Sequence, residues 1–242
     1  MSVAIYYHPE AYSTVGPRLM GRNAAGESFL KGYFLHSDDD SFWVHTSSKS
    51  SAESFAKVAR SFNRNQVVQF INFENLNALS KPGTLYYPGP DICSQALNRS
   101  FYGNNSWSIC GITHTTSSLS AIDAISSLIT SPIFEWDALI CTSQAVKINV
   151  ENVIGSTIKY YESRFGAKEF VLPQLPIIPL GINVDDFSFS QDEQLKARKY
   201  FDIEENTIVV LYMGRLSFHA KAHPLAMYQA LESAYANTKN NI

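Results

Sequence analysis

The sequence lacks the features that direct a chain into a membrane or a secretory pathway. No run of about 18 apolar residues occurs, and no basic and then apolar leader opens the chain. Cysteine is scarce, and the uneven spacing of Cys93, Cys110 and Cys141 favours reduced core thiols over a disulfide framework. These absences predict a cytoplasmic protein with neither a signal peptide nor a transmembrane helix.

A strong charge of either sign and the common nucleotide-binding fingerprints are also missing. The net charge of −3 over 242 residues gives no electrostatic reason to expect nucleic acid as a partner. Neither G-x-G-x-x-G nor a Gly-Lys-Ser/Thr triplet occurs. His219 and His223 lack a nearby glutamate that would complete a zinc pattern, and the acidic run 38–40 is typical of a solvated turn. We therefore expect no metal site.

Short apolar runs alternate with helical patterns along the first three quarters of the chain. Such runs, with few polar interruptions, are typical of strands buried on both faces. Ser118 is a candidate helix cap, and an apolar stripe from Ala52 to Ala59 predicts another helix. The expected strands are Val3–Tyr7, Ser41–His45, Val67–Phe73, Thr84–Tyr87, Trp107–Thr113 and Ala138–Thr142, with weaker candidates at Phe170–Leu172 and Ile177–Leu180. The alternation predicts an α/β fold with a doubly wound parallel sheet of the Rossmann type.

A domain boundary is expected after a proline-rich stretch. Ser190 and Glu193 form a capping-box pattern, which opens a helix that leads into the apolar run Ile208–Tyr212. We place a first domain at residues 1–184 and the start of a second α/β domain at 185–242. Only about 20 residues follow Lys221, so the second domain is expected to be truncated after one strand-turn-helix unit.

The turn after this last expected strand carries two cations. Arg215 follows Gly214, and Lys221 lies six residues beyond the arginine. A strand that feeds such a turn at the carboxyl end of a parallel sheet is a common place for phosphate binding. Arginine can hold two phosphate oxygens at once, and lysine acts as a point charge. The alternative is that both are solvated charges at a strand end.

Three stretches in this order resemble the family 4 glycosyltransferases, retaining enzymes with two facing Rossmann-like domains (the GT-B fold). They are the segment 21–30 (Gly-Arg-Asn-Ala-Ala-Gly-Glu-Ser-Phe-Leu), the crossover 178–183 followed by Phe187, and the turn 214–217 with Lys221. The resemblance implies metal-independent transfer from a nucleotide-sugar donor to a carbohydrate or lipid-linked acceptor, without a cofactor. It departs in two places: the family's lysine usually lies five residues after the arginine, and its paired glutamates in the second domain have no counterpart.

The resemblance also implies roles for residues of the first domain. A histidine at the end of the fifth strand, here His114, faces the reacting sugar and acceptor, although it could instead cap the next helix. The first loop is expected to run from Pro9 to Gly26, and Gly16 or Gly21 would allow close approach of the donor diphosphate. Arg22 would contact acceptor or phosphate, with a surface salt bridge as the alternative.

Two classes of function therefore stay open. One is a retaining glycosyltransferase, or a piece of one that lacks turnover by itself. The other is a non-catalytic Rossmann-like module that binds a ligand or a partner. Peripheral membrane association and self-association through the truncated domain remain open for either class.

Overall fold

The computed structural model describes residues 2–15, 20–212 and 224–238. The chain divides into two compact units, Met1–Ile182 and Asn183–Ile242. Each unit has its own secondary structure and is described by itself.

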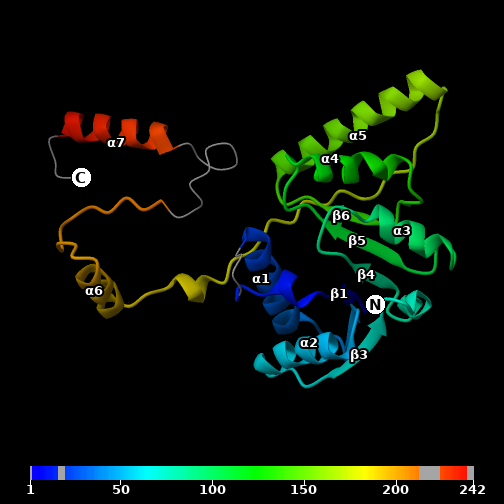
Figure 1. The fold of residues 1–242 in the computed structure, drawn as a ribbon, viewed down its shortest axis with the longest axis horizontal. Coiled ribbons are helices and arrows are strands. Elements are labelled where there is room, and N and C mark those ends of the chain that lie inside the picture. Colours follow the sequence, from blue (N-terminus) through cyan, green and yellow to red (C-terminus); the bar gives the residue numbers. More distant parts are fainter. Residues whose placement is uncertain (1, 16–19, 213–223, 239–242) are drawn as a thin grey trace. The chain divides into compact units, whose positions relative to one another are not determined.

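The first unit is built on a parallel sheet of six strands in the order β3-β2-β1-β4-β5-β6 (Figure 1). Every neighbouring pair is parallel. The strands are β1 (Ala4–Tyr6), β2 (Ser41–Thr46), β3 (Val67–Asn72), β4 (Thr84–Tyr86), β5 (Ser108–Ile112) and β6 (Ala138–Ile140). The doubly wound α/β fold predicted from the alternating apolar runs is thereby confirmed, and each of the six stronger strand predictions matches a strand.

Helices connect the strands and begin where serine caps are available. Ser48, Ser118 and Ser143 each accept a hydrogen bond from the backbone N–H three residues on, which satisfies a first-turn donor. The helices of this unit are α1 (Gly21–His36), α2 (Lys49–Ser61), α3 (Cys93–Ser100), α4 (Leu119–Ser126) and α5 (Gln144–Phe165), with short 3₁₀ turns η1 (Pro9–Tyr12), η2 (Leu76–Ser80) and η3 (Ser127–Ile129). The cap predicted at Ser118 is confirmed.

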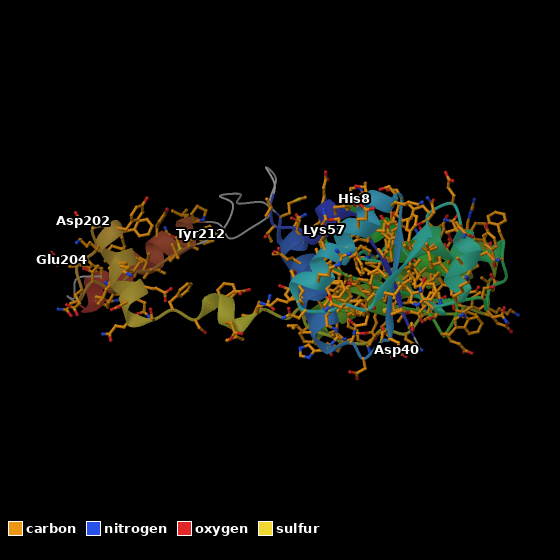
Figure 2. The ribbon with its side chains drawn as sticks, turned by 90° about the horizontal axis from the view of Figure 1, so that it is seen from below. His8, Asp40, Lys57, Asp202, Glu204 and Tyr212 are labelled. Carbon is orange, nitrogen blue, oxygen red and sulfur yellow. The ribbon has the colours of Figure 1, made fainter. Side chains whose placement is uncertain are left out.

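The acidic run between α1 and β2 is a surface turn, as its composition predicts. Asp38 and Asp40 are exposed, and Asp40 is labelled on the surface in Figure 2. Asp39 accepts hydrogen bonds from the Ser37 hydroxyl (3.0 Å) and the Tyr33 hydroxyl (3.4 Å). The run therefore helps to form the turn.

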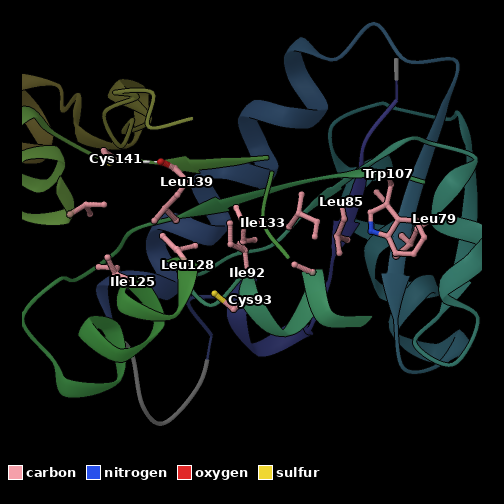
Figure 3. Close-up of a cluster of buried hydrophobic side chains, with 14 of the residues drawn as sticks. Leu79, Leu85, Ile92, Cys93, Trp107, Ile125, Leu128, Ile133, Leu139 and Cys141 are labelled. Atoms are coloured by element: carbon pink, nitrogen blue, oxygen red, sulfur yellow. Dashed lines mark hydrogen bonds between the residues drawn. The ribbon is translucent and has the colours of Figure 1, made fainter. Parts of the chain in front are cut away.

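Two apolar layers bury the faces of the sheet, because adjacent strand residues point to opposite sides. Ile5 packs with Leu30 of α1 and Phe55 of α2 on one face. On the other face, Leu85 and Ile109 pack against residues of α3, α4 and α5 (Figure 3). Helices on both faces leave the two ends of the strands as the places where polar groups can gather.

A buried ion pair closes the amino ends of β5 and β6. The guanidinium of Arg99 on α3 holds both carboxylate oxygens of Asp137, at 2.6 and 2.8 Å, and both side chains are fully buried. The same carboxylate accepts backbone N–H groups from Ile109 and Phe134, and Arg99 also donates to the Trp107 carbonyl. The sequence analysis did not identify this pair, which joins α3 to two strand starts.

The proline-rich segment after α5 does not form the weaker predicted strands. It runs beside β6 through isolated parallel bridges at Gln174 and Ile177 only, and the segment 170–172 is irregular. Pro173, Pro176 and Pro179 lack the N–H that a continuous ladder needs. Both predictions are therefore wrong, although the segment still covers part of the β6 edge.

The second unit contains η4 (Val184–Phe187), α6 (Gln191–Tyr200) and α7 (Pro224–Thr238). The predicted capping box is confirmed, because Ser190 and Glu193 exchange hydrogen bonds at the start of α6. The segment 208–212 is irregular, so the predicted strand Ile208–Tyr212 is wrong among the described residues. A strand is stable only when a neighbour pairs its backbone, and the described part of this unit offers no other strand.

The sequence analysis also addressed transmembrane helices and the state of the cysteines. The helices of the described ranges include none with both the length and the apolar character that crossing a bilayer requires. The three cysteines are free; Cys93 and Cys141 are buried, and Cys110 is partly exposed.

Candidate functional site

The strand order places a topological switch between β1 and β4. Connections from β1 lead outward on one side through α1, and connections from β4 lead outward on the other side through α3. In such sheets the carboxyl ends of the two central strands leave a crevice in which ligands bind. Tyr7 follows β1, Tyr87 follows β4, and His114 follows β5 two residues after its end.

The segment after β1 is anchored rather than being one long open loop. Gly21, Arg22 and Gly26 all lie in α1, so the predicted loop from Pro9 to Gly26 is too long. The buried side chain of Asn23 accepts the Met20 N–H (3.1 Å) and donates to the Glu10 carbonyl. This amide fixes the start of α1 against η1.

Gly26 is a packing glycine. A Cβ at this position would overlap the carbonyl oxygen of Ala11 and press on the ring of Tyr12. The lack of a side chain therefore lets η1 lie directly against α1. Asn23 and Gly26 share a helix face with Leu30 and Phe34, all buried, and this spacing was visible in the sequence.

Gly21 and Arg22 occupy the first turn of α1, and both are exposed. A Cβ on Gly21 would meet nothing within 4 Å. The first backbone N–H groups of a helix have no intrahelical partner, and they carry the positive end of the helix dipole. The side chain of Arg22 adds a full positive charge at the same place. This end of α1 therefore favours an anionic or strongly polar ligand.

His114 lies at the carboxyl end of the sheet, half-buried beyond Thr113. Thr113 is fully buried and donates both its N–H and its hydroxyl to the Ile140 carbonyl, which holds the end of β5 in place. Burial, and then the positive charge of Arg22, lower the pKa of His114 below its ordinary value of 6.5. The structure thus brings these two predicted site residues within electrostatic reach, and it favours the neutral form of the His114 imidazole.

The alternative of His114 as a helix cap is not what the structure shows, because Ser118 caps α4 through its own hydroxyl. A neutral imidazole can accept a proton or donate a hydrogen bond near neutral pH. This role requires a ligand at the crevice.

Sequence reasoning missed an aromatic group at the same edge. The rings of Tyr6 and Phe73 stack at a centroid distance of 4.7 Å, and Tyr87 meets Tyr6 edge-on at 4.9 Å. Beneath them His45 is buried, and the loss of hydration lowers its pKa to about 4. All four residues lie at or just beyond the carboxyl ends of strands, a position that sequence alone could have marked. Half-buried rings of this kind suit the apolar faces of a sugar or a base.

The predicted donor-phosphate residues Gly16, Arg215 and Lys221 lie outside the described residues. The histidine pair at 219 and 223 lies outside them as well. Within the described ranges, no group of three or more histidine, cysteine, aspartate or glutamate side chains is placed to hold a metal ion.

Comparison with known proteins gives a fold relationship and no sequence relationship. No family model and no curated protein matches the chain. Its structure is similar to that of HepE from Anabaena in complex with UDP, with a TM-score of 0.59 at 13% identity. The same protein in complex with UDP and glucose gives a TM-score of 0.58 at 12% identity. Both matches cover 96% of this chain, and the chain spans 58% of the HepE chain.

Proposed function

We propose that this chain belongs to a glycosyltransferase that moves a sugar from a nucleotide-sugar donor to an acceptor hydroxyl. The observation that carries the proposal is the place of half-buried His114 at the carboxyl edge of the sheet, where burial and then the charge of Arg22 lower its pKa. The similarity of fold to HepE, which was solved with UDP and glucose, supports it. The motifs in the sequence resemble family 4, so we propose retention of configuration and no metal requirement.

In this proposal the first unit binds the acceptor. His114 faces the reacting sugar and exchanges a hydrogen bond or a proton with its hydroxyls, for which its lowered pKa suits it at neutral pH. We propose that Arg22, in the first turn of α1, contacts the acceptor or the departing diphosphate, and that the amides at Gly21 favour the negative charge of the diphosphate. A preorganised charge at such a place stabilises the transition state more than the ground state.

The donor side of this proposal rests on the sequence motifs. We propose that Arg215 and Lys221 hold the diphosphate, with Gly16 or Gly21 allowing its close approach. The acceptor is proposed to be a carbohydrate or a lipid-linked sugar, and the site of action the cytoplasm, at the membrane surface where the acceptor is lipid-linked.

The test compares two histidine variants of the whole enzyme to which this chain is proposed to belong, in an assay of sugar transfer from UDP-glucose that is followed by UDP release over a panel of acceptors. His114→Ala is expected to lower transfer about 100-fold. His36→Ala is the control, since His36 is exposed at the last turn of α1. Equal rates for both variants would remove His114 from the mechanism.

The second candidate function is a module that binds the same ligands without chemistry. It is favoured if the same whole protein, with its wild-type sequence, binds UDP-glucose in calorimetry but releases no UDP with any acceptor. Absence of both binding and release would contradict the glycosyltransferase proposal and this alternative together.

A further inference from the structure

A surface groove of the first unit lies at the β3 edge of the sheet, separated by three strands from β5, which His114 follows. It is an open groove of about 430 Å³ between α2 and the strand β3. Its floor is apolar, formed by the small side chains of Ala52 and Ala56 and by Val68 and Phe70. Because the two alanines lie four residues apart, they leave a smooth channel along the helix.

The groove follows an edge of the sheet. β3 ends the strand order and has β2 as its strand neighbour among the described residues. An outer strand keeps one row of backbone N–H and C=O groups that a further strand can pair. The strand Val67–Asn72 contains no proline, lysine or arginine, which are the usual protections of such an edge, and Val67 is 63% exposed. The edge is therefore open to strand addition.

The charges around the groove are mainly positive. Lys49 lies at one end, Arg60 and Arg64 lie at the other, and Glu53 is the single acid between them. Lys49 and Arg60 are exposed on α2, eleven positions apart, which is about 16 Å along the helix axis. An extended chain of about five residues covers the same distance. A strand laid in the groove can therefore bring one acidic side chain to each end.

Arg64 is held in position by its own contacts. Its guanidinium donates to the Ser37 carbonyl and lies over the ring of Phe42, at 5.7 Å from the centroid. The Nε–H of Arg64 is buried without a hydrogen-bond partner. Because these contacts already hold the Arg64 side chain, it loses little conformational freedom when an anion binds at this end of the groove.

We propose that this groove binds an acidic, extended segment of a partner protein, which adds to the sheet as a strand beside β3. Acids at both ends of the segment pair with the cations, and an apolar side chain between them packs on the two alanines. A second copy of this chain fits poorly. Two-fold pairing of two β3 edges would bring α2 against its counterpart and place Lys49 of one copy opposite Arg60 of the other.

The probe is a labelled peptide, acetyl-Thr-Glu-Thr-Val-Thr-Glu-Thr-amide, with both acids and the valine on one face of the strand. Binding is followed by fluorescence anisotropy. Lys49→Glu and Arg60→Glu are expected to weaken binding about tenfold or more each. Lys57→Glu is the matched control: it makes the same charge change on the same helix, and Lys57, labelled in Figure 2, is exposed outside the groove lining. Circular dichroism confirms that each variant is folded.

Four further probes use the wild-type protein and separate strand addition from attraction of charge alone. A peptide with lysine in place of glutamate is expected not to bind. Two peptides, each N-methylated on one alternate set of amides, test the backbone pairing, and at least one is expected to lose binding about tenfold. The proposal is overturned if the parent peptide does not bind, if both methylated peptides bind as well as the parent, or if a short oligothymidylate binds more tightly.

Discussion

The two ends of the parallel strands use charge in opposite ways. At the amino ends, Arg99 and Asp137 are fully buried, and they form hydrogen bonds with each other and with several backbone groups. At the carboxyl ends, Arg22 is exposed and His114 is half-buried, with a lowered pKa and a charge nearby. Charged side chains that are buried and paired inside the protein stabilise the fold. Charged side chains that are accessible to solvent can interact with a ligand. The predictions below test this contrast.

The largest effect is expected at the amino ends. Asp137→Ala leaves the Arg99 guanidinium buried and unpaired, and it also removes the acceptor for the N–H groups of Ile109 and Phe134. The free energy of unfolding should fall by about 3–5 kcal/mol in urea denaturation. Asp123→Ala on the exposed side of α4 is the control and should change it by less than about 0.5 kcal/mol. A loss as small as that of the control would show that the pair does not hold the fold together.

The next effect is a dependence of stability on pH that comes from the carboxyl ends. The pKa of buried His45 is about 4, against 6.5 for a free histidine, so the unfolded chain takes up the proton first as the pH falls. Stability should therefore decline from about pH 6.5 down to about pH 4, by about 3 kcal/mol from this residue. His114 adds a decline of the same sign.

His45→Gln should flatten this decline, whatever it costs in stability at pH 7, because glutamine does not titrate. His36→Gln, at an exposed position, should leave the slope unchanged. Urea denaturation at several pH values measures both, and identical slopes for wild type and His45→Gln would contradict the assignment.

Two glycines in α1, Gly26 and Gly21, are predicted to differ in role: one allows close packing, and the other allows close approach of a ligand. Gly26→Ala should lower the free energy of unfolding by about 1–3 kcal/mol, because its methyl group would overlap the Ala11 carbonyl. Gly21→Ala meets no atoms and should change stability by less than about 0.5 kcal/mol. If Gly21 admits the donor diphosphate, the same variant should raise the KM for the nucleotide sugar. Equal stability losses at the two positions would refute the distinction.

The smallest effect concerns the link between Arg22 and His114. Arg22→Gln removes a positive charge that disfavours the imidazolium, so the pKa of His114 should rise toward its ordinary value. Burial, the larger cause, remains, so the pKa should stay below 6.5. An NMR titration of the His114 ring measures the shift, and an unchanged or lower pKa would show that the two side chains do not interact.

Periodicity and capping residues were enough to predict the regular parts of the fold. Short apolar runs located the six strands, because a strand buried on both faces needs apolar residues at nearly every position. Ser118 and Ser190 located two helix starts, because a cap is a local hydrogen bond between residues close in the chain. The position of His114 at the end of β5 followed from the same pattern.

The sequence predicted strands less well where a strand forms only if a neighbouring strand pairs with it. The run Ile208–Tyr212 has the composition of a strand, but pairing decides whether a strand forms, and no partner is present among the described residues. The segment at Ile177 has a neighbour in β6, yet prolines limit it to isolated bridges. Composition alone could not distinguish either case from a true strand.

By itself, the sequence determined the order of strands and helices, the parallel sheet and the placement of polar residues at the strand ends, since each depends on local periodicity or on a cap. Tertiary structure decided which of those residues meet. Arg99 finds Asp137, Arg22 comes within reach of His114, and Gly26 admits η1 only because the folded chain brings distant segments together. Burial then decides which charged groups stabilise the fold, because a charged group that has lost its water needs a partner inside the protein.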